Sequence, residues 1–269
     1  MEVPPPLQLR ITTWNALNPF YENEEYYTKE AHPYLHWDEG RRERALAYLK
    51  PLDSDVYCLQ EVRPDVAHLL HHALGKETYT LVWHARTPDG DSEPDGCATL
   101  YRTSRLVLAE KIIWRYKSRR HIFMACLFAC DADRVPLWIV NTHVNYMTRE
   151  QDLAALQRKL TRGKKFVTGS KVIVGDFNAR RSEDWYQLLG ENGIIDTMSE
   201  HQRNQWSYSY KSGHDAKWID YILLHRLPPD SVVRVFVDIE FPRFNDTALP
   251  NERVPSDHMP LTAVIRLRV

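Results

Sequence analysis

The chain has 269 residues, with 35 Lys and Arg against 36 Asp and Glu, which gives a formal net charge of −1. Hydrophobic residues make up 43% and charged residues 26%, a composition that is typical of a folded globular protein and excludes a disordered one. The balanced charge also excludes a strongly basic nucleic-acid-binding surface. Contact with a polyanion must therefore be local, or carried by a bound metal ion.

The length predicts one domain over residues 1–269, although ~150 residues per domain would also allow two. The N-terminal sequence MEVPPPLQLR has no apolar signal-peptide core, and no stretch approaches the ~18 apolar residues of a membrane span. Four cysteines lack zinc-ligand spacing, and we interpret them as structural: Cys58, Cys97, Cys126 and Cys130. We expect a cytoplasmic or nuclear protein that is not secreted and has no membrane span. The sequence does not indicate an oligomeric state.

Short apolar runs predict strands along most of the chain. Residues 7–14 alternate between apolar and polar side chains at first, as in a strand with one polar face. Further strands are predicted at residues 56–59, 79–85, 98–101, 122–129, 137–142, 171–174, 218–224, 232–237 and 261–267. Several of these runs are apolar on both faces, which is typical of central strands covered by helices.

Helices are predicted between these strands, at residues 39–49, 64–74, 148–160 and 182–189. Pro64 suits the first turn of its helix, and Thr148 is the expected N-cap of the next one. Strands outnumber helices, which indicates a mixed α/β protein. Two segments interrupt the pattern: a tyrosine-rich insertion at 18–37 and an acidic, turn-rich loop at 87–96.

Polar residues recur where the predicted strands begin or end. They are Trp14-Asn15, Gln60-Glu61, Asn141-Thr142-His143, Gly175-Asp176-Phe177-Asn178, Asp220 and Ser256-Asp257-His258. Each alone has a structural explanation as a turn former, a helix cap or a satisfied histidine. Together they offer only carboxylates, amides and imidazoles, and strand ends that meet at one sheet edge are where α/β proteins build their sites.

This set of side chains indicates metal-assisted phosphoester chemistry. Carboxylate and amide oxygens are hard ligands that suit Mg²⁺, or Mn²⁺ as a substitute, rather than zinc. Imidazoles can bind or protonate a phosphoryl oxygen, and a carboxylate can orient an imidazole or a water. Asp176 and Asn178 are two residues apart, so they project to the same side of an extended segment. P-loop, GxSxG and HExxH motifs are absent from the sequence.

In this order the motifs resemble those of the endonuclease/exonuclease/phosphatase (DNase I-like) superfamily, from about residue 9 to residue 265. The resemblance implies a four-layer α/β sandwich in one domain, with two packed mixed β-sheets flanked by helices. It also implies a metal-dependent phosphodiesterase, nuclease or phosphatase. Glu61 is then the implied principal Mg²⁺ ligand, with Asn15 close to the metal and the phosphate and Asp257 near the metal.

The same resemblance implies the catalytic roles. Asp176, helped by Asn178, would orient or deprotonate the attacking water. His143 and His258 would contact the scissile phosphate and stabilise its developing negative charge. Asp220 would hold His258 in the required tautomer.

Two further segments resemble the CCR4/nocturnin/Angel branch of the superfamily, whose enzymes act on RNA 3′ ends or on small nucleotide phosphates. They are Tyr34-Leu35-His36-Trp37 followed by Arg41-Arg42-Glu43-Arg44, and Asp95-Gly96-Cys97-Ala98. The chain is short for this branch and carries no leucine-rich repeat region. Ala16-Leu17 follows Asn15 where some DNA-repair relatives carry an aspartate or tyrosine, which disfavours an abasic-site endonuclease.

Three residues are the substrate-binding candidates. Arg149, six residues after His143, either contacts phosphate or faces the helix surface. Tyr34 and Trp37, with the other aromatics of the insertion, either stack on a base or pack the insertion onto the body. The basic cluster at residues 115–121 either tracks a phosphate backbone or forms a solvated hairpin.

The leading hypothesis is a Mg²⁺-dependent phosphoester hydrolase acting on RNA 3′ ends or nucleotide phosphates, as a CCR4-like exoribonuclease or a 2′,3′-cyclic phosphate phosphodiesterase. A phosphatase of small molecules, such as inositol phosphates or phospholipids, is one alternative. A DNA endonuclease is a second, and a catalytically inactive binding scaffold is a third. Retention of the whole motif set argues against the scaffold.

Overall fold

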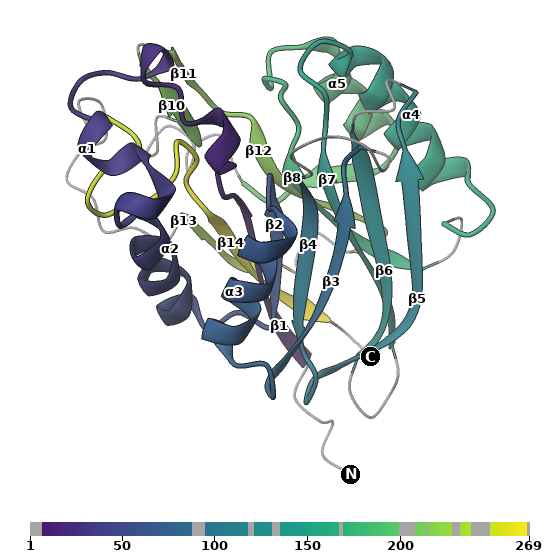
Figure 1. Cartoon of the computed structure of the whole chain (residues 1–269). Helices are drawn as coiled ribbons and strands as arrows, with labels where there is room; N and C mark the ends of the chain where they lie inside the picture. Colours follow the sequence, from purple (N-terminus) through teal and green to yellow (C-terminus); the bar gives the residue numbers. More distant parts are fainter. Residues whose placement is uncertain are drawn as a thin grey trace.

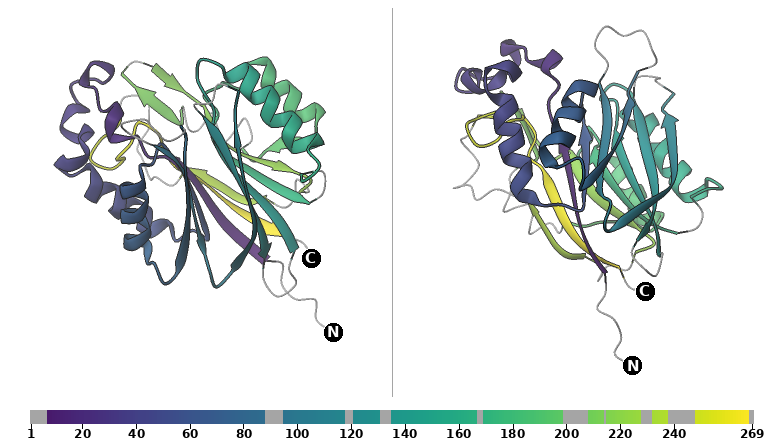
Figure 2. Two further views of the ribbon diagram at one scale, coloured as in Figure 1. Left: turned by 45° about the vertical axis from the view of Figure 1, so that its right-hand side comes forward. Right: turned by 60° about the horizontal axis from the view of Figure 1, so that its bottom comes forward.

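Two six-stranded sheets pack face to face, and helices cover their outer faces (Figures 1 and 2). This arrangement comes from a computed structural model of the chain, which describes residues 7–87, 95–117, 121–130, 135–166, 169–198, 208–213, 215–227, 232–237 and 248–267. The predicted four-layer α/β sandwich is confirmed.

The first sheet joins both ends of the chain. Its strands, in spatial order, are β13 (Val232–Val237), β14 (Leu261–Leu267), β1 (Leu7–Asn15), β2 (Val56–Gln60), β4 (Gly96–Arg102) and β3 (Tyr79–Ala85). The β1–β2 pair is parallel and the other pairs are antiparallel, so the sheet is mixed. The C-terminal ends of β1 and β2 therefore lie at the same edge.

The second sheet repeats this plan. Its strands, in spatial order, are β5 (Leu106–Arg115), β6 (Ile122–Cys130), β7 (Val135–His143), β8 (Ser170–Asp176), β12 (Asp220–His225) and β9 (Ile194–Asp196). The β7–β8 pair is parallel, whereas β12 runs antiparallel to β8. A separate hairpin, β10 (Tyr210–Ser212) and β11 (Asp215–Lys217), lies beside α1 at the upper edge in Figure 1.

Helices cover the outer face of each sheet because their apolar faces are buried against it. On the first sheet these are α2 (Arg41–Leu49) and α3 (Pro64–Leu74), and on the second they are α4 (Arg149–Arg162) and α5 (Asp184–Glu191). The insertion at 18–37 contains the short helix α1 (His32–Leu35) and two 3₁₀ turns, η1 (Pro19–Tyr21) and η2 (Glu24–Tyr26). Two more 3₁₀ turns flank α2: η3 (Trp37–Glu39) precedes it and η4 (Lys50–Leu52) follows it. None of the described helices has the length and apolar character needed to cross a membrane.

The central core lies between the sheets. Ile11 and Cys58 of the first sheet pack in one cluster with Cys126, Ile139 and Val174 of the second. The neighbouring residues along each strand point outward to the helices, so these strands are apolar on both faces. All four cysteines are buried and unpaired, as the structural interpretation predicts.

The structure contains each strand and helix predicted from the sequence, some with the predicted bounds and others with shifted ends. Gly40 adopts φ 98°, so the helix predicted from residue 39 begins at Arg41. Thr148 occupies the predicted N-cap, but its hydroxyl donates to Asp152 (2.8 Å) rather than accepting from the backbone. The edge strand β5 was not predicted, because a bulge between Leu108 and Glu110 interrupts its two-residue period.

Three short strands, β9, β10 and β11, were also missed, because three residues cannot show a clear period. Some sequence features fall outside the described residues: most of the acidic loop at 87–96, the centre of the basic cluster at 115–121, and residues 199–207.

Candidate active site

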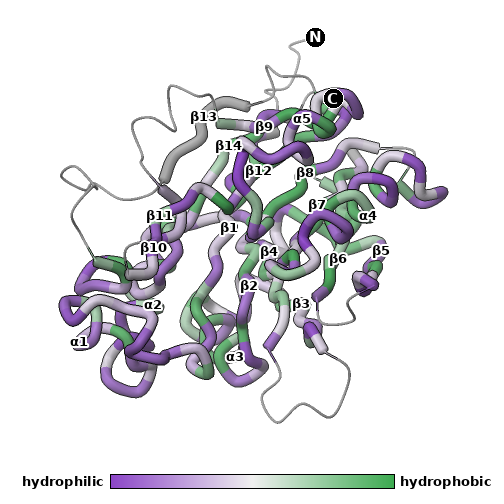
Figure 3. The backbone as a smooth tube through the Cα atoms, turned by 90° about the horizontal axis from the view of Figure 1, so that it is seen from above, coloured by the Kyte–Doolittle hydropathy of each residue, from purple (hydrophilic) through white to green (hydrophobic). Residues whose placement is uncertain are grey.

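The sequence motifs meet at one edge of the two sheets. Asn15 pairs with Gln60 where β1 and β2 end, and Asp176 pairs with both His143 and Asp220 where β7 and β8 end and β12 begins. Figure 3 looks down on this edge, with α1 and α2 on one side and α4 and α5 on the other. The two parallel pairs explain the convergence, because parallel strands end at the same edge.

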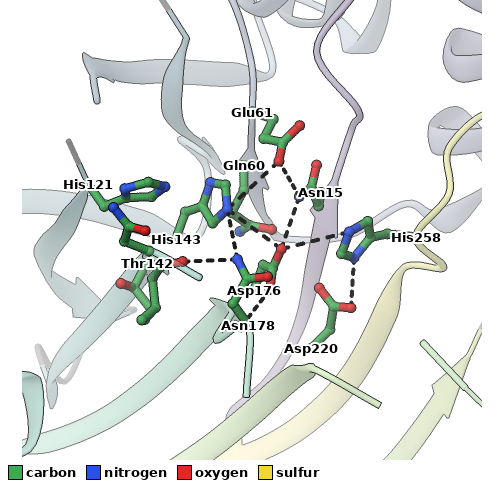
Figure 4. A network of polar contacts seen from close by, with 12 residues as sticks. Asn15, Gln60, Glu61, His121, Thr142, His143, Asp176, Asn178, Asp220 and His258 are labelled. Carbon is green, nitrogen blue, oxygen red and sulfur yellow. Dashed lines mark hydrogen bonds and ion pairs between the residues drawn. The ribbon is translucent and has the colours of Figure 1, made fainter. Parts of the chain in front are cut away.

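Asn15 joins the two sheets at the centre of the site. Its Nδ2 atom donates to Oε1 of Glu61 (3.0 Å) and to Oδ2 of Asp176 (3.1 Å), as Figure 4 shows. The Leu17 amide donates to Oδ1 of Asn15 (3.0 Å), which fixes the orientation of the side-chain amide. The backbone N–H of Asn18 donates a hydrogen bond to the other carboxylate oxygen of Glu61, Oε2 (3.2 Å). Both carboxylates are therefore held in place by protein groups.

Glu61 and Asn178 share an uncommon backbone conformation. Their φ angles are 55° and 49°, in the left-handed region that non-glycine residues rarely adopt. Such conformations concentrate at functional sites. Gly175 is required for a different reason: a Cβ atom there would lie 1.8 Å from the carbonyl oxygen of Thr142 on β7.

A buried amide pair beneath the site fixes the distance between the sheets. Gln60 donates through Nε2 to Oδ1 of Asn141 (2.8 Å), and Asn141 donates through Nδ2 to the carbonyl oxygen of Ala98 (2.9 Å). Both side chains are fully buried, where a lost hydrogen bond is costly. Gln60 and Asn141 of the motifs thus have a structural role.

His143 faces Glu61 and Asp176. Its Nε2 atom lies 3.7 Å from Oε1 of Glu61, 3.6 Å from Oδ2 of Asp176 and 3.2 Å from Nδ2 of Asn178. Burial, then the positive charge of Arg86, lowers the pKa of His143 well below its usual value. The ring is therefore a neutral imidazole, and its Nε2 atom is the ring nitrogen that faces the site.

His258 is held in the opposite charge state. Its Nδ1 atom lies 2.9 Å from Oδ2 of Asp220, and its Nε2 atom lies 3.7 Å from Oδ2 of Asp176. Burial disfavours the charged ring, but Asp220, with Asp176 and Asp257, outweighs this and raises the pKa of His258 to about 10. The site thus contains an imidazolium on one side and a neutral imidazole on the other.

Asp176 is a buried carboxylate with charged neighbours on several sides. Burial, with repulsion from Asp220 and Glu61 set against the attraction of His258, raises the pKa of Asp176 to about 7. The backbone N–H of Asn178 donates a hydrogen bond to Oδ1 of Asp176 (2.8 Å). A carboxyl group that is half ionised at neutral pH suits proton transfer.

The donor set fits a divalent cation. Potential ligand atoms of Glu61, His143 and Asp176 lie within 4.8 Å of one another, as do those of Asp176, Asp220 and His258. Carboxylates packed this closely in a buried place repel one another, and a cation would relieve that repulsion. The residues of this site could therefore hold a divalent metal ion.

Asp257 and Arg149 line the same cleft, which has a volume of about 1060 Å³. Asp257 is buried beside His258 and accepts a hydrogen bond from the Tyr27 hydroxyl (3.0 Å), which ties the insertion to this wall. Arg149 pairs through Nε with Oε2 of Glu183 (2.9 Å). The structure brings both residues to the cleft, although Asp257 faces Tyr27.

Two substrate-binding predictions are corrected by the structure. Trp37 is buried in the core beneath α2, with the guanidinium of Arg41 lying 5.0 Å from its ring. The ring of Tyr34 packs under the guanidinium of Arg44 at 5.3 Å, and Tyr34 is not among the residues that line the cleft. Both residues pack the insertion onto the body, because the chain turns at Gly40 and brings α2 against them.

Other aromatic residues line the cleft instead: Phe20, Tyr21, Tyr26, Tyr27, Tyr146 and Tyr210. Tyr146 and Tyr210 were missed as site residues. Tyr146 comes only three residues after His143, and that short spacing was the available signal. The Tyr210 ring packs on the ring of His258 at 4.8 Å, a contact that no local sequence pattern reveals.

Arg86 was also missed, and it lies directly behind the site. Its Nε atom is 2.7 Å from Oδ1 of the buried Asp95, and its guanidinium also contacts Tyr21 and His121. The ring of His121 packs edge-on against His143 at 4.8 Å (Figure 4). Burial raises the pKa of Asp95 to about 6 despite Arg86. Asp95 of the Asp-Gly-Cys-Ala segment thus acts through its ion pair with Arg86, which lies next to the site.

Arg41 is a second supporting residue, and its side chain is fully buried. It donates to the carbonyl oxygens of Ala16 (2.9 Å), Leu17 (2.9 Å) and Pro255 (3.2 Å), and it pairs with Glu22. These carbonyls come just after the first motif and just before the last. One guanidinium therefore connects two segments that are more than 200 residues apart in sequence.

The fold and the site together define a hydrolase of phosphoester bonds. The model of the endonuclease/exonuclease/phosphatase family matches residues 12–258, and the chain belongs to this family. All the strand-end motifs predicted from the sequence lie within or at the end of the matched range.

Several curated relatives are similar over most of the chain. Protein angel of Drosophila melanogaster is 25% identical over 289 residues, covering 95% of this chain and 80% of the relative. The CCR4-Not complex 3′-5′-exoribonuclease subunit Ccr4 of Kluyveromyces lactis is 24% identical, covering 93% of this chain. This chain spans only 40% of that relative's length.

Solved structures have the same fold. ANGEL2, described as a 2′,3′-cyclic phosphatase and bound to adenosine-2′,3′-vanadate, superposes with a TM-score of 0.77 at 19% identity, covering 98% of this chain and 97% of the other. The human nocturnin catalytic domain gives a TM-score of 0.65 at 19% identity, covering 98% and 94%. At these identities the likeness establishes the fold alone.

Proposed function

We propose that this protein is a Mg²⁺-dependent phosphoester hydrolase that acts on RNA 3′ ends or nucleotide phosphates, as an exoribonuclease or a 2′,3′-cyclic phosphate phosphodiesterase. The observation that supports this best is the bridge made by Asn15 between Glu61 and Asp176, with His143 and His258 on either side. The similar proteins Ccr4, a 3′-5′-exoribonuclease, and ANGEL2, a 2′,3′-cyclic phosphatase, act on substrates of this kind.

Glu61 would hold the Mg²⁺ ion, with Asn15 beside it and Asp176 across from it. When bound, this ion would polarise a phosphoryl oxygen and lower the pKa of a bound water. Asn15 and the Asn18 amide keep Glu61 in place. The acidic cluster would thus be arranged before substrate arrives.

Asp176 would accept the proton of the attacking water. Its raised pKa makes it a better base than an exposed aspartate, and Asn178 fixes its orientation. The imidazolium of His258 would donate from Nε2 to a phosphoryl oxygen as negative charge develops there, while Asp220 keeps Nδ1 protonated. The neutral ring of His143 would position the phosphate from the other side.

The charges of the cleft favour a substrate with few phosphates. Arg149 pairs with Glu183, and both Arg180 and Lys217 pair with Asp215. These paired cations leave little positive charge to bind a polyanion such as an inositol polyphosphate. A single scissile phosphodiester at an RNA end or on a nucleotide fits this balance better.

The proposal is tested by incubating the protein with labelled RNA that carries a 3′-hydroxyl, a 3′-phosphate or a 2′,3′-cyclic phosphate, with and without Mg²⁺. Single- and double-stranded DNA and an inositol phosphate serve as comparison substrates. Stepwise shortening identifies an exonuclease, and loss or opening of the end phosphate alone identifies a phosphatase or cyclic phosphodiesterase. If the protein turns over none of these phosphoesters with Mg²⁺ or Mn²⁺, the proposal fails and the result favours the binding scaffold.

A further inference from the structure

Large aromatic side chains are exposed at the mouth of the active-site cleft. Phe20 is 60% exposed, Tyr26 67% and Tyr146 63%, and all three line the cleft. Most other large aromatic side chains among the described residues are buried or half-buried. Exposed aromatic faces beside a catalytic centre are a characteristic of ligand recognition.

The three rings belong to two walls. Phe20 and Tyr26 lie in the 3₁₀ turns of the insertion, and Tyr146 lies in the connection between β7 and α4. Figure 1 shows the insertion, near α1, and the β7–α4 connection on opposite sides of the upper edge. Asp176 and His258 line the same cleft.

Protein contacts hold both walls in place. On the insertion wall, Ser212 donates to the carbonyl oxygen of Tyr26 (2.6 Å), and the neighbouring Tyr27 donates to Asp257 (3.0 Å). On the other wall, Nδ2 of Asn178 donates to the carbonyl oxygen of Val144 (2.9 Å), close to Tyr146. The backbone segments that carry the rings are therefore held by residues that line the same cleft.

The surroundings of the rings suit a flat, weakly charged partner. The Arg149 guanidinium lies 6.0 Å from the Tyr146 ring and is neutralised by Glu183. A nucleobase matches this combination, because every base has a π face and stacks on aromatic side chains without regard to sequence. Inositol and the glycerol of a phospholipid have no such face.

We propose that Tyr146 on one wall and Phe20 and Tyr26 on the other form a nucleobase-binding subsite that holds unpaired bases beside the scissile phosphate. This inference rests on the proposed function and narrows its substrate class to single-stranded nucleic acid ends. Bases in a duplex already stack and pair, so they are not available to these rings.

The test compares two RNA oligonucleotides that have the same phosphoester end, one with its terminal base and one with an abasic terminal ribose. The wild-type protein is expected to favour the base-bearing RNA by at least roughly tenfold in kcat/KM, mainly through KM. Tyr146→Ala, and the double variant Phe20→Ala/Tyr26→Ala, should each reduce this preference by roughly five- to tenfold. Tyr146→Trp should retain it, because tryptophan also stacks.

Val107→Ala is the matched control, because Val107 is 66% exposed on β5 and is not among the residues that line the cleft. Its base preference should equal that of the wild type. If the wild type hydrolyses both RNAs equally, or if Tyr146→Ala retains the full preference, the subsite is overturned while the proposed function stands. If the wild type hydrolyses neither RNA with Mg²⁺, the proposed function fails and the subsite fails with it.

Discussion

The Nδ1 atom of His258 lies 2.9 Å from Oδ2 of Asp220, and both side chains are almost completely buried. This pair has a clear electrostatic consequence. The Asp220 carboxylate holds a positive charge on a ring that burial alone would keep neutral, and the pKa of His258 rises to about 10. The ring presents its Nε2 proton toward Asp176, where the reaction is proposed to occur.

Asp220→Asn should move the alkaline limit of activity to lower pH. The imidazolium of His258 exists below its pKa of about 10, so activity should fall as pH rises through that value. Without the Asp220 charge the pKa falls, and the alkaline limb of kcat should shift down by roughly one to two pH units. The pH profile of kcat measures this shift. An unchanged alkaline limb in a folded variant would show that His258 is not the acid.

Asp176→Ala should lose at least ~100-fold of the hydrolytic rate. The variant removes both the proposed base and one wall of the metal site, whereas Asn15 and Glu61 remain paired. Single-turnover rates on the preferred RNA end measure the loss, and circular dichroism verifies the fold. A folded variant with undiminished hydrolysis would refute the role given to Asp176.

Arg41→Lys should reduce both stability and kcat, because an ammonium group cannot reproduce the contacts of a buried guanidinium. We expect a loss of ~3 kcal/mol or more in the free energy of unfolding and roughly 10- to 100-fold in kcat, through displacement of the segments that Arg41 connects. The neighbouring Arg42 is 46% exposed and, among the residues that the structure describes, pairs with the adjacent Glu43; it offers the matched control.

Denaturant unfolding and steady-state kinetics of both variants test this prediction. Arg42→Lys should change the free energy of unfolding by less than ~0.5 kcal/mol. Equal effects of the two substitutions would contradict the positioning role of Arg41.

Mg²⁺ should raise the melting temperature, and more at pH 8 than at pH 5. In the metal-free protein the pKa of Asp176 is raised to about 7, above its unfolded value, so the folded state keeps this proton longer and stability falls as pH rises toward 7. A cation competes with that proton, so it binds better at pH 8 and stabilises more there. Thermal unfolding measures the shift, which Glu61→Gln should abolish at both pH values.

The residue patterns predicted a mixed α/β protein and the positions of the motifs, and the family resemblance of those motifs implied the four layers. Strands that pack on the other sheet with one face and on helices with the other, such as β2, were recognised as short continuous apolar runs. The edge strand β5 escaped because its bulge shifts the period. Because the motifs follow strand ends in chain order, Glu61, Asp176 and His258 could be assigned to one site without knowledge of their tertiary contacts. The structure brings them together.

The positions of the aromatic side chains could not be predicted. Trp37 and Tyr146 are both aromatic residues near a motif, yet one is buried under Arg41 and the other is exposed in the cleft. Which face a ring presents depends on tertiary packing rather than local pattern. The hydrogen bond from Arg41 to the carbonyl oxygen of Pro255 could not be predicted for the same reason. The single-domain prediction and the cellular location stay predictions.

The most direct test is anomalous diffraction from crystals of the wild-type protein soaked in Mn²⁺. Central to the account is one cation held between Glu61 and Asp176, beside Asn15. It predicts an anomalous peak within ~2.3 Å of a Glu61 carboxylate oxygen, lost in Glu61→Gln crystals. Density for Mn²⁺ elsewhere, with none beside Glu61, would contradict it.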